Sequence, residues 1–504
     1  MPREFALSQA AKTKLKPTSF TGWGVSPVAP AHLRPVVKDG VLIRPMHQAM
    51  ANYRTPVRPS NIPRPKAVMA LAMQQFTKLT QNCSRQVLTF EEAVIGIPSM
   101  KLKAVNRKTS PGWPWRLTAA NGKKDFFGTA DELDFSSEAC RALRERCDFI
   151  EEKAMEGVRC GHICCDFLKD ETRPLAKVEA VATRAISGAP LDYTIVTRKW
   201  FGAFLSALFS YHTISGMAPG INYYNEWSVL ARELQRRGEK MFAGDFKAFD
   251  ASEQPDIHKL ILDKINDWYD QFEVDPIGRM VRTVLWEDLV HSRHLTGDGP
   301  ILDTVVQWNK SLPSGHPLTT AVNSMYSLFT LTACYVKATG DYENMWQHAF
   351  ICTFGDDNVV SADNDTIEVF NQVTVAAMMK DMFGLTYTSD KKDAELKPYE
   401  TINDITFLKR SFVESVSDGG WIAPLAMDSI LYRTYFYKSE RSVVEDLAEN
   451  FKEALLELSL HPRKEWDARY GAAATYCRDM GIELPITSYD EAREICLART
   501  DVWY

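Results

Sequence analysis

The chain has 504 residues and contains no long uninterrupted apolar stretch. No run approaches the length of about 18 apolar residues that a membrane-spanning helix needs, so direct membrane insertion is not expected. The opening residues, MPREFALSQAAKTKLKP, lack the apolar core of a secretory signal. Internal repeats and low-complexity tracts are also missing. A chain of this length without them predicts two or three subdomains or one large enzyme fold.

The ten cysteines follow no repeated spacing, which suits a reducing compartment with free thiols. One local cluster, RCGHICCDF, places Cys160, His162, Cys164 and Cys165 close together. These residue types can bind zinc. However, positions 160, 162 and 164 are also alternate positions of a β-strand, and we favour the strand.

The net charge of −6 argues against a protein that binds nucleic acid through overall charge alone. The charge distribution is uneven, because residues 5–66 contain ten Lys and Arg, nine prolines and the single acid Asp39. Such a segment is extended and cationic. It could lie along a polyanion or strap other elements together, and a solvated arm is the alternative.

The pattern of apolar residues predicts an α+β enzyme core, in which strands and helices alternate between helical flanks. Helices are expected over most of 67–160, over 200–236, around 257–269, after SGHPL and near the C-terminus. Capping boxes are expected from Thr89 to Glu92 and from Ser442 to Glu445. In the last helix, a stripe of apolar residues predicts packing: Val444, Leu447, Phe451, Leu455 and Leu458.

Two adjacent acids, Asp356 and Asp357, lie between apolar runs in CTFGDDNVV. A hairpin turn is the simplest interpretation. Asp245, however, ends another apolar strand, with Asp250 five residues later. If the two elements are neighbours in one sheet, three carboxylates meet at a strand end and bind cations. Oxygen ligands without His or Cys favour Mg²⁺, and a pair of Mg²⁺ ions is suited to phosphoryl transfer.

Other polar residues could complete such a site. A segment with four basic residues between positions 169 and 184 could cover a triphosphate. Because acids accompany these basic residues, a salt-bridged surface strand is the alternative. In SGHPLTTAVN, residues 319 and 323 share one helix face, with helix capping as the alternative. Lys391 could donate a proton to pyrophosphate, or be merely exposed. The basic residues are Lys169, Arg173, Lys177 and Arg184.

The order of motifs is distinctive: KDETRP and TRAI, then GDFKAFD, SGHPLTTAVN, FGDDN, TSDKKD and FLKRSF. This series resembles the RNA-dependent RNA polymerases of positive-strand RNA viruses. Within the picorna-like group, the motif sequences resemble most those of dicistroviruses and related lineages. The resemblance covers residues 100–412 and extends more loosely into both ends.

The resemblance implies an α+β closed right hand, with fingers, a thumb and a palm whose antiparallel sheet is flanked by helices. The implied domains are fingers 1–200 with the basic arm 5–66, palm 201–255, a fingers insertion 256–302, palm 303–412 and thumb 413–504.

The resemblance also implies residue roles. Asp245 and Asp356 would be the principal ligands of two Mg²⁺ ions, for which Mn²⁺ can substitute, and Asp357 would support them. The general acid is left open between Lys391 and Lys392. Asp250 and Asn323 would recognise the ribose, with help from Ser314, Gly315 and Thr319. The four basic residues named above would cover the nucleotide. Template and primer contacts fall to Thr109, Ser110 and Gly112 and to Phe407, Leu408, Lys409 and Arg410.

The implied activity is template-directed RNA synthesis from NTPs, replicating a viral positive-strand RNA genome. Implied partners are template and product RNA, a protein primer and other viral replication proteins, in host cytoplasm at membrane-associated complexes reached through partners. A reverse transcriptase-like palm polymerase and a non-catalytic RNA-binding scaffold are the alternatives. The small acid Asp250 favours ribonucleotides, because enzymes that exclude the 2′-hydroxyl place a bulky residue near this position.

Overall fold

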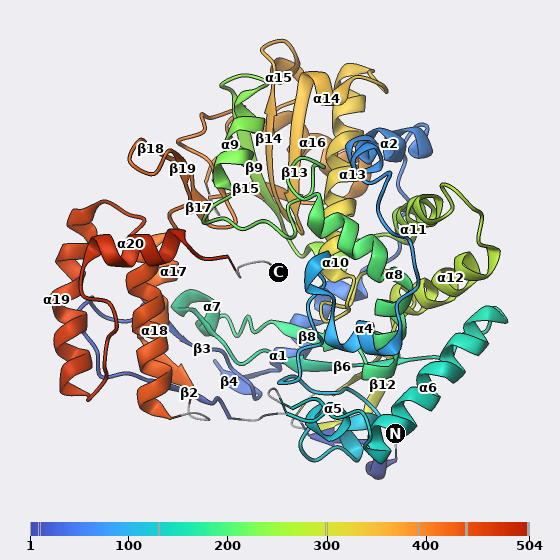
Figure 1. Cartoon of the computed structure of the whole chain (residues 1–504), viewed down its shortest axis with the longest axis horizontal. Coiled ribbons are helices and arrows are strands. Elements are labelled where there is room, and N and C mark those ends of the chain that lie inside the picture. The colour runs from blue at the N-terminus through green and yellow to red at the C-terminus, as the bar shows by residue number, and fades with distance from the viewer. Residues whose placement is uncertain are drawn as a thin grey trace.

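An antiparallel four-stranded sheet carries the predicted aspartates (Figure 1). The computed structural model describes residues 2–8, 10, 12–129, 132–297, 299, 301–391, 394–438 and 442–500. In the sheet, the hairpin β13–β14 pairs with β9 through its second strand, and β15 lies on the other side of β9. The order is β13 (Ala349–Phe354), β14 (Asp357–Ala362), β9 (Met241–Phe246) and β15 (Tyr387–Ser389).

Helices pack against this sheet because their sequences are apolar on most sides. The long helix α13 (Thr319–Thr339) is buried from Ala321 to Val336 and ends at Gly340, whose φ of 73° closes the helix in the left-handed conformation. It contacts β13, α16 (Gln372–Phe383) and α11 (Pro255–Tyr269). In α11 the predicted apolar face is buried at Ile257, Ile261 and Ile265, while Leu260 is half-buried.

A second, mixed sheet lies beside the first. Its order is β12 (Thr304–Gln307), β10 (Arg293–Thr296), β6 (Ile163–Leu168) and β8 (Ala185–Gly188), with β10 and β6 parallel. An isolated bridge between Gly188 and Gly315 joins this sheet to the loop before α13. The cysteine-rich stretch leads into β6, where Cys164 and Cys165 are buried.

Four helices pack against one another in a further group: α4 (Phe90–Ile95), α6 (Glu138–Met155), α8 (Leu191–Ser210) and α12 (Pro276–Val290). The predicted capping box between Thr89 and Glu92 is confirmed. The predicted helix over 200–236 is wrong in its middle. Helix α8 ends at Ser210 and α9 (Trp227–Gln235) begins later, because Gly216 and Gly220 turn the chain with φ values of 87° and 106°.

The C-terminal helices have a core of their own (Figure 1, red). Helix α18 (Val443–Leu458) buries four of its five predicted stripe residues, but Val444 is exposed. The predicted capping box at its start is wrong, because the Ser442 side chain makes no capping hydrogen bond. The other helices here are α17 (Met427–Leu431), α19 (Arg463–Asp479) and α20 (Tyr489–Leu497). Within the described residues, no helix is both long and apolar enough to cross a membrane.

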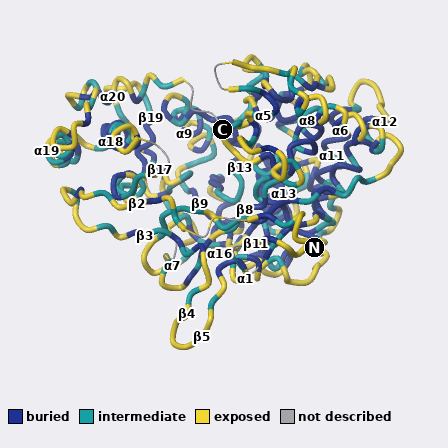
Figure 2. Tube along the Cα trace, turned by 90° about the horizontal axis from the view of Figure 1, so that it is seen from below, coloured by how far each residue is buried: buried dark blue, intermediate teal, exposed yellow. Residues whose placement is uncertain are grey.

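The basic N-terminal arm straps the molecule together. Strand β2 (Leu15–Pro17) pairs with β20 (Phe436–Lys438) beside the C-terminal helices, and β3 (Val28–Pro30) pairs with β7 (Thr172–Pro174). In the chain between β3 and α1 (Pro45–Ala49), the strands β4 (Val36–Lys38) and β5 (Val41–Ile43) form a hairpin. This hairpin projects outward, and most of its residues are exposed (Figure 2). The strapping interpretation of the arm is therefore confirmed.

Candidate active site

The structure brings Asp245 and Asp356 together. Asp245 lies near the end of β9, and Gly355, with a φ of 63°, turns the β13–β14 hairpin so that Asp356 occupies its tip. Because Asn358 pairs with Gly244, this tip lies next to Asp245. The two carboxyl groups are close enough to share a hydrogen bond.

The surroundings of Asp356 disfavour its charged form. Burial, the charges of Asp245 and Asp357 and the hydrogen bond with Asp245 raise the pKa of Asp356 to about 8. Acids that repel in this way bind a cation readily, because the cation removes the repulsion.

The donor set fits magnesium better than zinc, because it consists of carboxylate oxygens. In the described part of the chain, no three His, Cys, Asp or Glu side chains form a ready-made metal cage. The expected convergence of three carboxylates is therefore reduced to a close pair, with Asp357 at the start of β14 beside it. Mg²⁺ tolerates this arrangement, since it often takes one or two carboxylates and completes its shell with water and substrate phosphates.

A cavity of about 660 Å³ opens beside this pair and is lined by Asp250, Asn323, Asp356, Ser314 and Arg184, among others. The amide Nδ2 of Asn323 donates a 2.6 Å hydrogen bond to Asp250 Oδ1. Asn323 Oδ1 is buried and has no hydrogen-bond partner among the described residues. This oxygen is thus available to accept a hydrogen bond from a hydroxyl group of a ligand.

The loop before α13 is held against β8. The backbone N–H of Ser187 donates to Ser314 Oγ at 3.1 Å, and Gly315 N–H donates to the Ser187 carbonyl at 2.9 Å. Glycine is required there, because a Cβ at position 315 would lie 2.5 Å from that carbonyl oxygen. The hydroxyl of Thr319 is within hydrogen-bond distance of the carbonyls of Pro313 and His316, so it braces this loop. The helix-capping alternative is wrong for Thr319, because Leu318 is the cap residue of α13 and no side chain makes a capping hydrogen bond there.

Three of the four predicted basic residues gather around Glu171. Lys169 lies 3.5 Å and Arg173 3.8 Å from its carboxylate, and Arg184 donates to it from two nitrogens. Burial alone would raise the pKa of Glu171, but these cations outweigh burial and lower it. The salt-bridged alternative therefore describes the contacts of these three residues. Lys177 lies apart, on the exposed helix α7 (Leu175–Glu179).

Lys391 is paired, not free. Its Nζ lies 3.0 and 3.1 Å from the two carboxylate oxygens of Glu400. Lys392, the alternative general acid, lies outside the described residues. Glu400 therefore holds the candidate proton donor through an ion pair that the sequence pattern did not predict.

The expected template loop is a rigid turn. Thr109 and Ser110 are exposed, and Lys123 Nζ donates to Thr109 Oγ1 at 2.5 Å. Gly112 has a φ of 74°, and a Cβ there would lie 2.8 Å from the Cα of Pro190. The backbone conformation and the close approach both require glycine.

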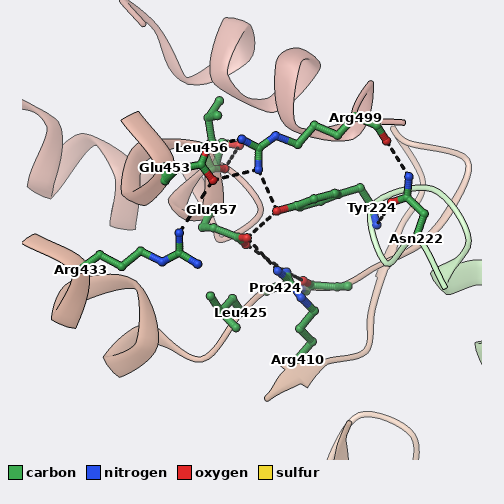
Figure 3. A network of polar contacts seen from close by, with 12 residues as sticks. Asn222, Tyr224, Arg410, Pro424, Leu425, Arg433, Glu453, Leu456, Glu457 and Arg499 are labelled. Carbon is green, nitrogen blue, oxygen red and sulfur yellow. Dashed lines mark hydrogen bonds and ion pairs between the residues drawn. The ribbon is translucent and has the colours of Figure 1, made fainter. Parts of the chain in front are cut away.

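The hairpin of FLKRSF turns at Leu408 and Lys409, which both have positive φ, between Phe407 and Arg410. The expected primer contact by Arg410 does not fit its position. Arg410 is 4% exposed and donates to both carboxylate oxygens of Glu457 in α18, at 3.0 and 2.7 Å (Figure 3). A buried ion pair therefore uses this side chain to join the hairpin to the C-terminal helices.

Sequence reasoning missed the contribution of the N-terminal arm. Gln48, Asn52 and Tyr53 line the same cavity as Asp250. No local pattern marks them, because they reach the cavity through a contact between segments about 200 residues apart in sequence.

The comparisons with known proteins place these features in a family. The sequence model of the viral RNA-dependent RNA polymerase family matches residues 17–474. A solved structure, the Sicinivirus 3Dpol RNA-dependent RNA polymerase, superposes with a TM-score of 0.82 over 99% of this chain and 98% of that chain, at 19% identity. The fold is therefore the right-hand polymerase fold, and the chain belongs to the viral RNA-dependent RNA polymerase family.

Curated relatives of this chain include viral polyproteins. The replicase polyprotein of acute bee paralysis virus is 30% identical over 92% of this chain, and that of cricket paralysis virus is 28% identical over 91%. The genome polyprotein of rice tungro spherical virus is 31% identical over 84%. The chain spans 24% and 27% of the first two relatives and 13% of the third. The predicted likeness to dicistroviruses and related lineages is confirmed.

Proposed function

We propose that this chain synthesises RNA from NTPs on an RNA template by two-metal nucleotidyl transfer. The observation that carries the proposal is the contact between Asp245 and Asp356 beside the cavity that contains Asp250 and Asn323. Carboxylates are thus available for cations next to a polar cavity large enough for a nucleotide.

Asp245 and Asp356 would hold two Mg²⁺ ions, or Mn²⁺ in their place, with Asp357 as a supporting acid. When bound, such ions lower the pKa of a 3′-hydroxyl and neutralise charge on the leaving pyrophosphate. The cations around Glu171 would exchange that partner for the triphosphate, and Arg184 already lines the cavity. Lys391 would need to leave Glu400 to protonate pyrophosphate.

Discrimination between NTPs and dNTPs rests on the Asp250–Asn323 pair. The unpartnered Asn323 Oδ1 would accept a hydrogen bond from the ribose 2′-hydroxyl, with Ser314 and Gly315 shaping the wall. A deoxyribonucleotide would leave this buried oxygen without a partner, which costs about 1–3 kcal/mol. This feature favours an RNA polymerase over a reverse transcriptase.

In this proposal, fingers 1–200 and 256–302, palm 201–255 and 303–412 and thumb 413–504 enclose template and product RNA. Thr109, Ser110 and Gly112 would contact the template, and Leu408 and Lys409 the primer strand. The expected primer contact by Phe407 does not fit its position, because Phe407 is 2% exposed and stacks on Trp227. The biological role would be replication of a positive-strand viral RNA genome in host cytoplasm. A protein primer and other viral replication proteins would be its partners and would bring it to membranes.

The test is extension of a primed RNA template by the wild-type chain, with and without Mg²⁺, alongside Asp356→Asn. The matched control is Asp365→Asn, an exposed aspartate shortly after β14. We expect Mg²⁺-dependent extension that Asp356→Asn abolishes and Asp365→Asn retains. Equal extension by the two variants would contradict the metal role, and a chain that only binds RNA would be a scaffold.

A further inference from the structure

A second cavity, of about 780 Å³, lies between the N-terminal arm and the second sheet. It is lined by arm residues 46–57, by parts of residues 296–310 and by Asp166 of β6. Its volume falls in the range of about 300–1,000 Å³ that is typical of small-molecule sites. Tyr53 lines both this cavity and the one beside Asp356, so the two are neighbours.

The two carboxylate oxygens of Asp166 differ in their hydrogen bonds to the described residues. Its Oδ1 accepts hydrogen bonds from Ser187 Oγ at 2.6 Å and lies 2.8 Å from His294 Nδ1, and Ser292 Oγ lies 2.8 Å from His294 Nε2. Asp166 is 0% exposed, and Oδ2 has no hydrogen-bond partner among the described residues. A buried carboxylate oxygen without a donor is costly, so this oxygen requires a donor from outside the described chain.

The Ser292–His294–Asp166 order is that of a hydrolytic triad, but it does not form a nucleophile site. Ser292 is 2% exposed and does not line the cavity, so a substrate could not reach its hydroxyl. Ser187 and His294 instead fix the orientation of Asp166, and Ser292 holds His294. His294 is in turn held by stacking on Trp308 at 3.5 Å between ring centroids, and Trp308 stacks on Tyr53 at 4.1 Å.

The rest of the cavity wall suits a nucleotide. Met46, Met50 and Trp308 contribute apolar atoms to the wall, and because Trp308 already stacks on His294 and Tyr53, a base would contact the edge of its ring. His47 and Arg54 also line the cavity, are exposed and make no ion pair with any described residue, so they could meet a phosphate group.

Among the four RNA bases, guanine alone presents two adjacent N–H donors, the ring imino group and the amino group, on one edge. Adenine and cytosine place a ring acceptor beside their amino group, and uracil flanks its N–H with carbonyls. An acceptor next to Asp166 Oδ2 would be repelled. We propose that this cavity binds guanine joined to a phosphate, with the two adjacent N–H groups directed at Asp166 Oδ2 and the phosphate facing Arg54 and His47.

The test is calorimetric titration of the full chain with GMP in EDTA, which keeps cation-dependent nucleotide binding out of the measurement. We expect saturable binding that Asp166→Asn weakens about 10- to 100-fold, as loss of hydrogen bonds to a charged group implies. IMP, which lacks the amino group, should bind more weakly than GMP. The matched control is Asp365→Asn, an exposed aspartate that does not line this cavity and should leave GMP affinity unchanged.

Asp166→Asn also alters contacts with Ser187 and His294, so a second variant keeps these contacts intact. Val57→Trp, on the arm side of the cavity, should fill the cavity and remove GMP binding without changing the residues that contact Asp166. Retained GMP affinity in both variants would overturn the proposal.

A second arm identifies the source of the base. A single-stranded RNA hexamer with a 5′-phosphorylated guanosine is titrated in the same way, next to an all-uridine hexamer. Binding of GMP points to a free nucleotide, and binding of the guanosine hexamer alone, lost in Asp166→Asn, points to a base of RNA. No binding of either overturns the proposal. This inference does not depend on the polymerase activity, because primed extension is measured separately and either result can fail alone.

Discussion

Two buried acids, Asp356 and Glu457, lie in opposite electrostatic surroundings. Asp356 faces Asp245 and Asp357, and burial with these charges raises its pKa to about 8. Burial would also raise the pKa of Glu457, but Arg410 and a hydrogen bond from Tyr224 outweigh burial and lower it. Both carboxylates are thus removed from water, but Arg410 outweighs burial at Glu457, whereas at Asp356 burial and the neighbouring acids outweigh the attraction to Arg184.

The network around Glu457 joins four segments of the chain (Figure 3). Arg410 comes from the FLKRSF hairpin, and Tyr224 from the loop before α9. Arg499 donates to Tyr224 Oη at 3.0 Å and forms an ion pair with Glu453 of α18. A paired buried charge therefore fixes how the C-terminal helices attach, whereas the carboxyl group of Asp356 is costly to ionise beside Asp245 and Asp357, and a bound cation would remove that cost.

The largest effect is expected from Asp356→Asn. The rate of nucleotide incorporation should fall by about 10³-fold or more, because a ligand of the proposed ions is lost. The melting temperature should not fall, because the substitution also removes repulsion from Asp245. Single-turnover extension measures the rate, and thermal melting measures the stability. A lower melting temperature with retained activity would show that Asp356 stabilises the fold and does not bind the ions.

The next effect is expected from Glu457→Gln, which leaves the buried Arg410 charge without its partner. Breaking a buried pair costs about 3–5 kcal/mol, so the melting temperature should fall clearly. Glu449→Gln, an exposed change on the same helix, is the control. Equal melting temperatures for the two variants would show that the network does not stabilise the attachment.

A smaller effect is expected from Asn323→Ala at the cavity. The preference for an NTP over the matching dNTP should fall about 10- to 100-fold, because the acceptor of the 2′-hydroxyl is lost. Competition between GTP and dGTP in primed extension measures the preference. An unchanged preference, with extension still active, would remove the ribose role of Asn323.

The smallest effect is a pH dependence of the Glu457 contribution. Since the pKa of Glu457 is lowered in the folded chain, its stabilisation is complete above the unfolded value of about 4.3 and is lost as the pH falls through the folded value. The difference in melting temperature between wild type and Glu457→Gln should therefore be constant near neutral pH and shrink below about pH 4.3. A difference that grows on acidification would contradict the paired state of Glu457.

The sequence predicted the elements that carry strong local patterns. Strand β9 with its terminal Asp245, the hairpin that holds Asp356 and the capped helix α4 all follow from alternation, turn residues and a capping box. Asp245 and Asp356 were expected to meet only if their strands were neighbours, and the motif order supplied that expectation. The register between β9 and β14 shows that they do.

Local patterns could not predict long-range pairing of charges. Arg410 and Glu457 lie 47 residues apart, and FLKRSF alone makes Arg410 look like an exposed cation. The ion pairs Glu400–Lys391 and Glu171–Arg184 were missed for the same reason. Which acid pairs with a given base depends on the tertiary fold. The arm residues near the cavity, including Tyr53, were missed because nothing in their own sequence marks the contact.

The central claim is that Asp245 and Asp356 act as one cation-binding unit, and a double-mutant cycle tests it most directly. Single-turnover incorporation at saturating Mg²⁺ is measured for Asp245→Asn, Asp356→Asn and the double variant. Residues that serve one unit are strongly non-additive, so the double variant should be about as slow as the slower single variant. Losses that multiply in the double variant would show two independent roles and would contradict the account.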